Sequence, residues 1–92
     1  MANELFNVAG KVVVMTGGAG VLGKGISKYL AAQGAKMVVL DRSEEAGKAL
    51  VDEIVAQGHE ATFLYTDVMN KEVLEQNKKD ILEKYGRIDV LL

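Results

Sequence analysis

The chain has 92 residues, enough for one domain with a hydrophobic core but few for a complete nucleotide-dependent enzyme. It has no cysteine, which excludes disulfides, thiolate metal sites and a cysteine nucleophile and fits a reducing cytoplasm. The net charge of −2, with no basic cluster denser than Lys78-Lys79, argues against a nucleic-acid surface. Without a long apolar span or a secretory leader, we expect a soluble cytoplasmic protein that binds no metal, nucleic acid or membrane.

The first predicted element is a strand. We expect three apolar residues of the lead-in to cover an edge of the sheet: Leu5, Phe6 and Val8. The apolar run Val12–Met15 is short and rich in β-branched residues, which suits a strand covered on both faces of a parallel sheet.

A glycine-rich turn and a helix follow this strand. The turn has glycine at Gly17, Gly18, Gly20 and Gly23. The spacing of apolar residues then predicts a helix over 21–33, with Leu22, Ile26 and Leu30 on its buried side. This order places N–H groups and the positive end of a helix dipole where a dinucleotide pyrophosphate can bind. We expect the backbone of residues 17, 18 and 20–23 to hold it, although G-x-G-x-x-G alone also fits any tight strand-to-helix turn.

The second predicted strand, 36–40, ends at Asp41. Asp41 follows the glycine turn by about 20 residues, where the dinucleotide fingerprint has an acid that accepts hydrogen bonds from the adenosine ribose. Such an acid favours NAD over NADP, because it would repel a 2′-phosphate by roughly 4 kcal/mol at contact distance. Arg42 could instead clamp that phosphate, but exposed ion pairs are worth only about 0 to 1 kcal/mol. The alternative is that Asp41 only begins a solvated loop.

A second helix and a third strand come next. Ser43 is a suitable N-cap for a helix that runs to about residue 57, with an apolar stripe of Ala46, Leu50 and Ile54. The third strand, 61–65, leads to Asp67, which could bond the adenine amino group while Val68 flanks the ring. Capping of the turn before the next helix explains Asp67 equally well on spacing alone.

The remaining elements complete an alternating pattern. Asn70 can cap a third helix through residue 85, with Val73, Leu74, Ile81 and Leu82 on its buried side, and 88–92 begins a fourth strand. Strict alternation predicts parallel strands with right-handed crossovers, hence an α/β fold with a Rossmann-type doubly wound sheet, βαβαβαβ in part. We expect residues 1–92 to be a single dinucleotide-binding domain and the amino-terminal portion of a longer one.

Other reactive side chains have structural interpretations. His59 is expected at the surface, and Thr16 is expected to tie the glycine turn together through its hydroxyl. Tyr29, Tyr65 and Tyr85 have no lysine four residues later to lower their pKa, so we expect them to be packing residues.

Four segments together resemble the amino-terminal half of the short-chain dehydrogenase/reductase family: 11–23, 38–42, 67–68 and 85–91. The turn Thr-Gly-Gly-x-Gly-Val-Leu-Gly is similar to that of sugar-acid members of the D-mannonate (fructuronate) oxidoreductase type. Single-domain members usually have glycine at Val21, whereas the spacing Thr16–Gly23 fits the extended, sugar-nucleotide branch. The charged third helix, which ends in Lys84-Tyr85-Gly86-Arg87, favours the single-domain branch.

The resemblance implies an NAD-dependent oxidoreductase that acts on a hydroxyl or ketone of a small molecule and forms a homo-oligomer. The family's catalytic Ser and Tyr-x-x-x-Lys lie beyond the matched segments, so we expect no catalytic residue within this chain. Two alternatives remain. One is a non-catalytic nucleotide-binding module, or a truncated product that associates through its fourth strand. The other is an epimerase-like extended member, suggested only by the glycine spacing.

Overall fold

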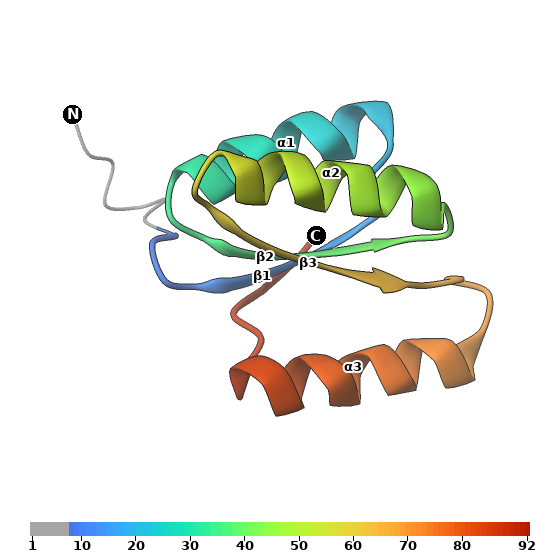
Figure 1. Cartoon of the computed structure of the whole chain (residues 1–92). Coiled ribbons are helices and arrows are strands. Elements are labelled where there is room, and N and C mark those ends of the chain that lie inside the picture. Colours follow the sequence, from blue (N-terminus) through green and yellow to red (C-terminus); the bar gives the residue numbers. More distant parts are fainter. Residues whose placement is uncertain (1–7) are drawn as a thin grey trace.

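A computed structural model describes residues 8–92 (Figure 1). It contains one parallel sheet, in the strand order β3-β2-β1-β4. The elements are β1 (Val12–Thr16), α1 (Val21–Ala32), β2 (Lys36–Asp41), α2 (Glu44–Ala56), β3 (Glu60–Tyr65), α3 (Lys71–Tyr85) and β4 (Val90–Leu91). The alternation expected from the sequence is confirmed. The fourth strand is shorter than the expected 88–92, because only residues 90 and 91 pair with β1.

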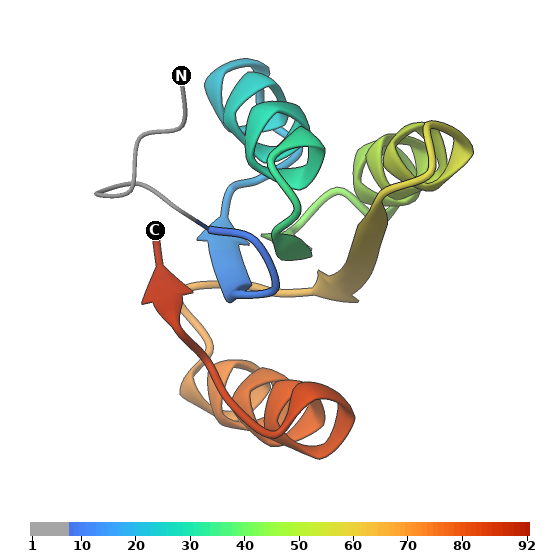
Figure 2. The ribbon, with the colours of Figure 1, turned by 90° about the vertical axis from the view of Figure 1, so that its left-hand side faces the viewer.

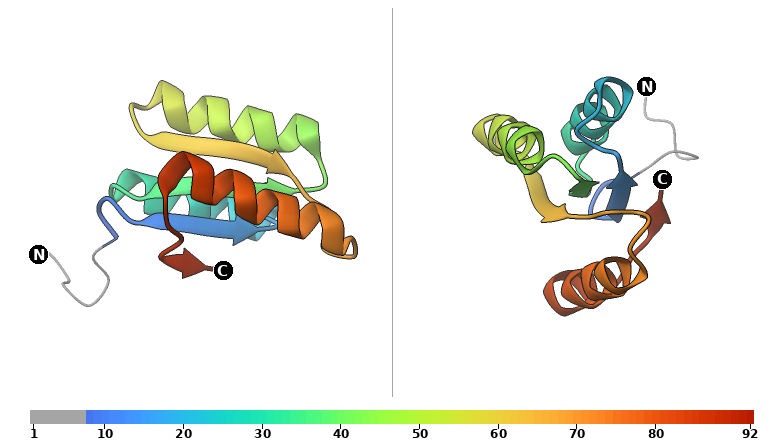
Figure 3. Two further views of the ribbon diagram at one scale, coloured as in Figure 1. Left: turned by 90° about the horizontal axis from the view of Figure 1, so that it is seen from below. Right: turned by 90° about the vertical axis from the view of Figure 1, so that its right-hand side faces the viewer.

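The helices cover the two faces of the sheet unequally. Figure 2 shows α1 and α2 on one face and α3 on the other, and Figure 3 shows α3 lying along the strands when the sheet is seen from below. The strand order explains this arrangement. The chain moves outward from β1 to β2 and β3, then crosses back to place β4 on the other side of β1. Since right-handed crossovers in opposite directions put their helices on opposite faces, the sheet is doubly wound as predicted.

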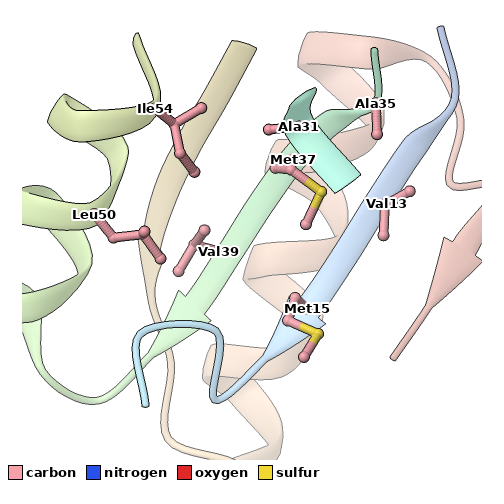
Figure 4. Close-up of a cluster of buried hydrophobic side chains, with 8 residues drawn as sticks. All are labelled: Val13, Met15, Ala31, Ala35, Met37, Val39, Leu50 and Ile54. Carbon is pink, nitrogen blue, oxygen red and sulfur yellow. The ribbon is translucent and has the colours of Figure 1, made fainter. Parts of the chain in front are cut away.

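The larger core lies between the sheet and the α1–α2 layer (Figure 4). Its side chains come from both central strands and both helices: Val13, Met15, Ala31, Ala35, Met37, Val39, Leu50 and Ile54. Burial on both faces of β1 and β2 explains why their sequences are continuous apolar runs. Val8 packs against this core, whereas the expectation for Leu5 and Phe6 lies outside the described residues.

The buried face of α1 differs from the predicted stripe. Leu22 is 77% exposed, whereas Ile26 and Leu30 are partly buried and pack against the core as predicted. The buried positions of the helix are instead Gly23, Ser27 and Ala31. Small side chains let the helix axis approach the glycine turn closely, and Ser27 donates its hydroxyl to the Gly18 carbonyl at 3.4 Å. Close approach therefore outweighs side-chain hydrophobicity at this helix.

A second cluster lies on the α3 face, where Ile81 packs on Val12, Val14, Val38 and Leu40. Beside it an apolar groove of about 390 Å³ separates α3 from β1 and β4. Asn77 lines this groove at 6% exposure, and its Nδ2 has no hydrogen-bond partner among residues 8–92. Leu82, predicted to be buried, is 40% exposed because α3 turns Asn77 and Ile81 inward.

Local interactions fix the ends of the elements. As expected, Ser43 accepts a hydrogen bond from Ala46 N–H and caps α2, and Asn70 accepts one from Val73 N–H and caps α3. The Thr16 hydroxyl does not close the glycine turn but donates to the Leu92 carbonyl at 2.9 Å. Thr16 therefore ties the end of β1 to the edge strand.

The three tyrosines have different surroundings. Tyr85 is partly buried and its hydroxyl lies 2.8 Å from the Thr62 hydroxyl, in agreement with the expected packing role. Tyr29 and Tyr65 are exposed, so the packing interpretation is wrong for them. Tyr29 lies on the exposed side of α1, and Tyr65 is the last residue of β3.

Candidate cofactor-binding site

The carboxyl ends of β1, β2 and β3 meet at one edge of the sheet and enclose a pocket of about 210 Å³. Its lining consists of Gly17, Asp41, Arg42, Thr66 and Val68. Four of these residues are predicted from the sequence and come from three separate segments. Ligands of open α/β sheets bind outside the carboxyl ends of the strands.

Gly17 and Gly23 shape the turn that borders the pocket. Gly17 has a φ of +66°, which favours glycine, and its N–H donates to the Leu40 carbonyl at 2.7 Å. A Cβ on Gly23 would overlap the Gly17 carbonyl oxygen. The turn thus folds back against the first turn of α1 and leaves no room for a side chain at Gly23.

Helix α1 begins without a side-chain cap at its N-cap residue, Gly20. The first helical hydrogen bond runs from Lys24 N–H to the Gly20 carbonyl at 2.7 Å. The N–H groups of Val21, Leu22 and Gly23 precede it and have no acceptor within α1. Val21, at 98% exposure, points its side chain into solvent, so its replacement of the usual glycine does not obstruct the helix start. These N–H groups and the helix dipole can attract an anion.

Asp41 connects the end of β2 to the glycine turn. One carboxylate oxygen, Oδ2, accepts a hydrogen bond from Ala19 N–H at 3.1 Å, and Oδ1 accepts one from Ser43 N–H at 2.9 Å. Each oxygen of a carboxylate has a second lone pair, so Asp41 can also accept from ligand hydroxyls. Asp41 therefore does more than begin a solvated loop.

Thr66 is a pocket residue that the sequence analysis missed. It is 1% exposed, and its Oγ1 has no hydrogen-bond partner within the described part of the chain. Its place could have been predicted, because Thr66 directly follows the third strand and therefore lies at the carboxyl edge of the sheet.

Asp67 does not line the pocket: its Oδ1 accepts from Met69 N–H at 3.0 Å and its carbonyl accepts from Asn70 N–H. Its role in the turn before α3 is thus observed.

The groups with shifted pKa values lie outside this pocket. Burial raises the pKa of Tyr85, and a hydrogen bond from Arg87 lowers the pKa of Asp89. Among residues 8–92 no cluster of three or more His, Asp or Glu side chains is arranged to hold a metal ion. None of the helices in that range has the length and apolar character needed to cross a bilayer.

Comparison with known proteins identifies similar chains. An uncharacterized oxidoreductase of Bacillus subtilis (strain 168), UxuB, is 43% identical over 86 residues, which cover 94% of this chain and 31% of that protein. A proposed D-mannonate oxidoreductase from Haemophilus influenza with bound NAD superimposes with a TM-score of 0.88 at 30% identity, over 92% of this chain and 30% of that one. A metagenomic short-chain oxidoreductase in complex with NADP gives 0.87 at 33% identity, over 92% and 38%.

These comparisons place the chain in a family. The 92-residue chain spans about a third of the length of these relatives. The family profile described as short chain dehydrogenase matches residues 11–92, which include every strand and helix of the sheet. The chain therefore belongs to the short-chain dehydrogenase family.

Proposed function

We propose that this chain holds the adenosine and pyrophosphate portion of NAD in an oxidoreductase that interconverts a hydroxyl and a carbonyl group. One observation carries the proposal: the Asp41 carboxylate lies beside the glycine turn, bonded to Ala19 N–H at 3.1 Å, in the same pocket as Val68. The proposed ribose acceptor, the proposed phosphate-binding helix start and the proposed apolar flank for adenine would thus be adjacent.

The residues fit the parts of a dinucleotide in order. The free N–H groups of the first turn of α1 would bind the pyrophosphate, with the backbone at Gly17, Gly18 and Gly20 close to it. Asp41 would accept from the ribose hydroxyls, and Val68 would flank the adenine. Asp67 would accept from the adenine amino group through carboxylate lone pairs that Met69 N–H does not use. The bound cofactor would supply the nicotinamide carbon that accepts or donates hydride.

The cofactor choice rests on neighbouring side chains of opposite charge. Solved relatives hold NAD in one case and NADP in another, so membership of the family does not decide between them. Asp41 and Arg42 both line the pocket, but the Asp41 carboxylate is fixed by two backbone N–H groups, whereas Arg42 is exposed. A fixed anion repels a 2′-phosphate, and an exposed guanidinium offsets this weakly. We therefore propose NAD.

The proposed substrate is a sugar acid such as D-mannonate or fructuronate. Its support is the glycine turn quoted above and the likeness to a proposed D-mannonate oxidoreductase. The catalytic Ser and Tyr-x-x-x-Lys would be supplied by polypeptide beyond this chain.

The absence of cysteine supports a proposed cytoplasmic location. We also propose a homo-oligomer, as the family resemblance implies.

Cofactor binding by the 92-residue chain tests the proposal. In calorimetric titrations we expect NAD to bind more tightly than NADP, and Asp41→Ala to weaken NAD about tenfold while NADP binding is unchanged or stronger. The control is Asp52→Ala, an exposed acid of α2, which should alter neither affinity. Failure of the wild-type chain to bind NAD, or a preference that Asp41→Ala leaves intact, would refute it.

Substrate class needs a separate assay. An enzyme that contains this chain should reduce NAD with D-mannonate and should oxidise NADH with fructuronate, both followed at the nicotinamide absorbance. Simple secondary alcohols serve as the comparison. Turnover of these alcohols without turnover of either sugar acid would overturn the sugar-acid proposal and leave cofactor binding intact.

A further inference from the structure

Three successive N–H groups of the glycine turn are anchored to the last residues of β2. The N–H groups of Gly17 and Gly18 donate to the Leu40 carbonyl at 2.7 and 3.3 Å. The N–H of Ala19 donates to Asp41 Oδ2 at 3.1 Å. The first two anchors join backbone atoms and depend on no side chain. The third depends on a single side chain, that of Asp41.

The third anchor lies at the end of the turn that adjoins the helix. Beyond Ala19 the Gly20 N–H donates to the Gly17 carbonyl, within the turn itself, and α1 then begins with N–H groups that have no acceptor within the helix. Glycines lose more conformational freedom than other residues when they are fixed in one conformation. A hydrogen bond at Ala19 therefore restrains the segment just before the proposed phosphate-binding amides.

We propose that Asp41 is a positioning residue for phosphate binding, in addition to its proposed contact with ribose. By holding Ala19 N–H, its carboxylate keeps the glycine turn in the conformation that presents the N–H groups of Val21, Leu22 and Gly23 to a diphosphate. This inference rests on the proposed function for the identity of the ligand. The restraint on the turn itself exists without any ligand.

The test uses a ligand that Asp41 cannot contact through ribose. The ligand 2′,3′-dideoxyadenosine 5′-diphosphate keeps the adenine and both phosphates but lacks the two hydroxyls. Asp41→Ala and Asp41→Asn remove the same negative charge, so charge repulsion changes equally in both. The Asn amide oxygen can still accept from Ala19 N–H, because Ser43 is exposed and its N–H can bond to water instead. We expect Asp41→Asn to bind this ligand about fivefold more tightly than Asp41→Ala.

Hydrogen exchange provides a readout without ligand. In Asp41→Ala the Ala19 amide should exchange at least several-fold faster than in the wild type, and Asp41→Asn should restore part of the protection. The Gly17 amide donates to the Leu40 carbonyl and should keep its protection in both variants. This unchanged protection would show that the fold is intact. Unchanged exchange at Ala19, or equal affinity of the two variants for the dideoxy ligand, would overturn the inference. If the wild type binds neither NAD nor this ligand, the proposed function fails, and exchange at Ala19 still decides whether the restraint exists.

Discussion

Asp89 and Val12 are joined by two hydrogen bonds although 77 residues separate them in the sequence. Asp89 Oδ2 accepts from Val12 N–H at 2.8 Å, and Asp89 N–H donates to the Val12 carbonyl at 2.9 Å. Arg87 holds the other carboxylate oxygen through Nε and Nη2. Since Val12 begins β1 and Asp89 directly precedes β4, this pair sets the register of the edge strand.

Substitution of Asp89 should destabilise the sheet more than loss of its ion pair. Asp89→Ala leaves the N–H of the buried Val12 without its acceptor, so the melting temperature should fall by several degrees. Arg87→Ala removes only the exposed partner and should have a smaller effect. Thermal unfolding followed by circular dichroism compares the two. Equal melting temperatures for the two variants would contradict this role of Asp89.

Stability should decrease in acid. The hydrogen bond from Arg87 lowers the pKa of Asp89, and a hydrogen bond from Lys28 lowers the pKa of Glu53. A carboxylate whose pKa is lower in the folded state stabilises it above the unfolded pKa, and this contribution is lost as pH falls through the folded pKa. The free energy of unfolding should therefore decline as pH falls below about 4. Urea unfolding over a pH series measures this, and Asp89→Asn should make the decline shallower; an identical slope would be inconsistent with the prediction.

Gly47 should not tolerate a side chain. A Cβ at this buried position of α2 would overlap the ring of Phe63 on β3. We expect Gly47→Ala to lower the free energy of unfolding by about 1–3 kcal/mol, as overpacked cores do. Gly25→Ala is the matched control, since nothing lies within 4 Å of its Cβ position, and it should raise stability by about 1 kcal/mol. Denaturant unfolding distinguishes the two, and a stabilising Gly47→Ala would disprove the close contact.

Asn77 should be replaceable by an apolar residue with a gain in stability. Its Nδ2 is buried beside the apolar groove and lacks a partner among residues 8–92. Asn77→Leu has a similar size and removes this desolvated donor, so we expect a gain of about 1 kcal/mol and a rise in melting temperature of about 4–8 °C. Asn77→Asp would bury a charge and should destabilise. A loss of stability in Asn77→Leu would indicate that the amide has a role in the fold.

The elements could be predicted because their signals are local. The apolar run at Val12, the caps Ser43 and Asn70, and the change of period after the glycine turn each fix one strand or helix within a few residues. Alternation and crossover handedness then determine the topology. The shared edge of the pocket follows as well, because Asp41 and Val68 end or follow parallel strands.

Side-chain environments were less predictable because they depend on how closely elements approach. Leu22 has the helical spacing of a core residue, but the glycine turn brings Gly23 and Ser27 inward. The hydrogen bond between Asp41 and Ala19 requires the register of β1 against β2, which no local pattern contains. The same holds for Thr66, whose burial depends on its neighbours across the sheet.

The strand order also determines when the sheet can be completed. β1 pairs with β2 and β2 pairs with β3, so the pairing of these consecutive strands and the α1–α2 layer can form while later residues are still being synthesised. β4 instead joins β1 across almost the whole length of the chain, and such distant contacts form slowly because a long loop must close first. During synthesis the β1 edge beside β4 therefore stays unpaired until the ribosome has released Asp89 and the residues after it. We expect this interval to be the time at which the nascent chain is most prone to pair with another copy.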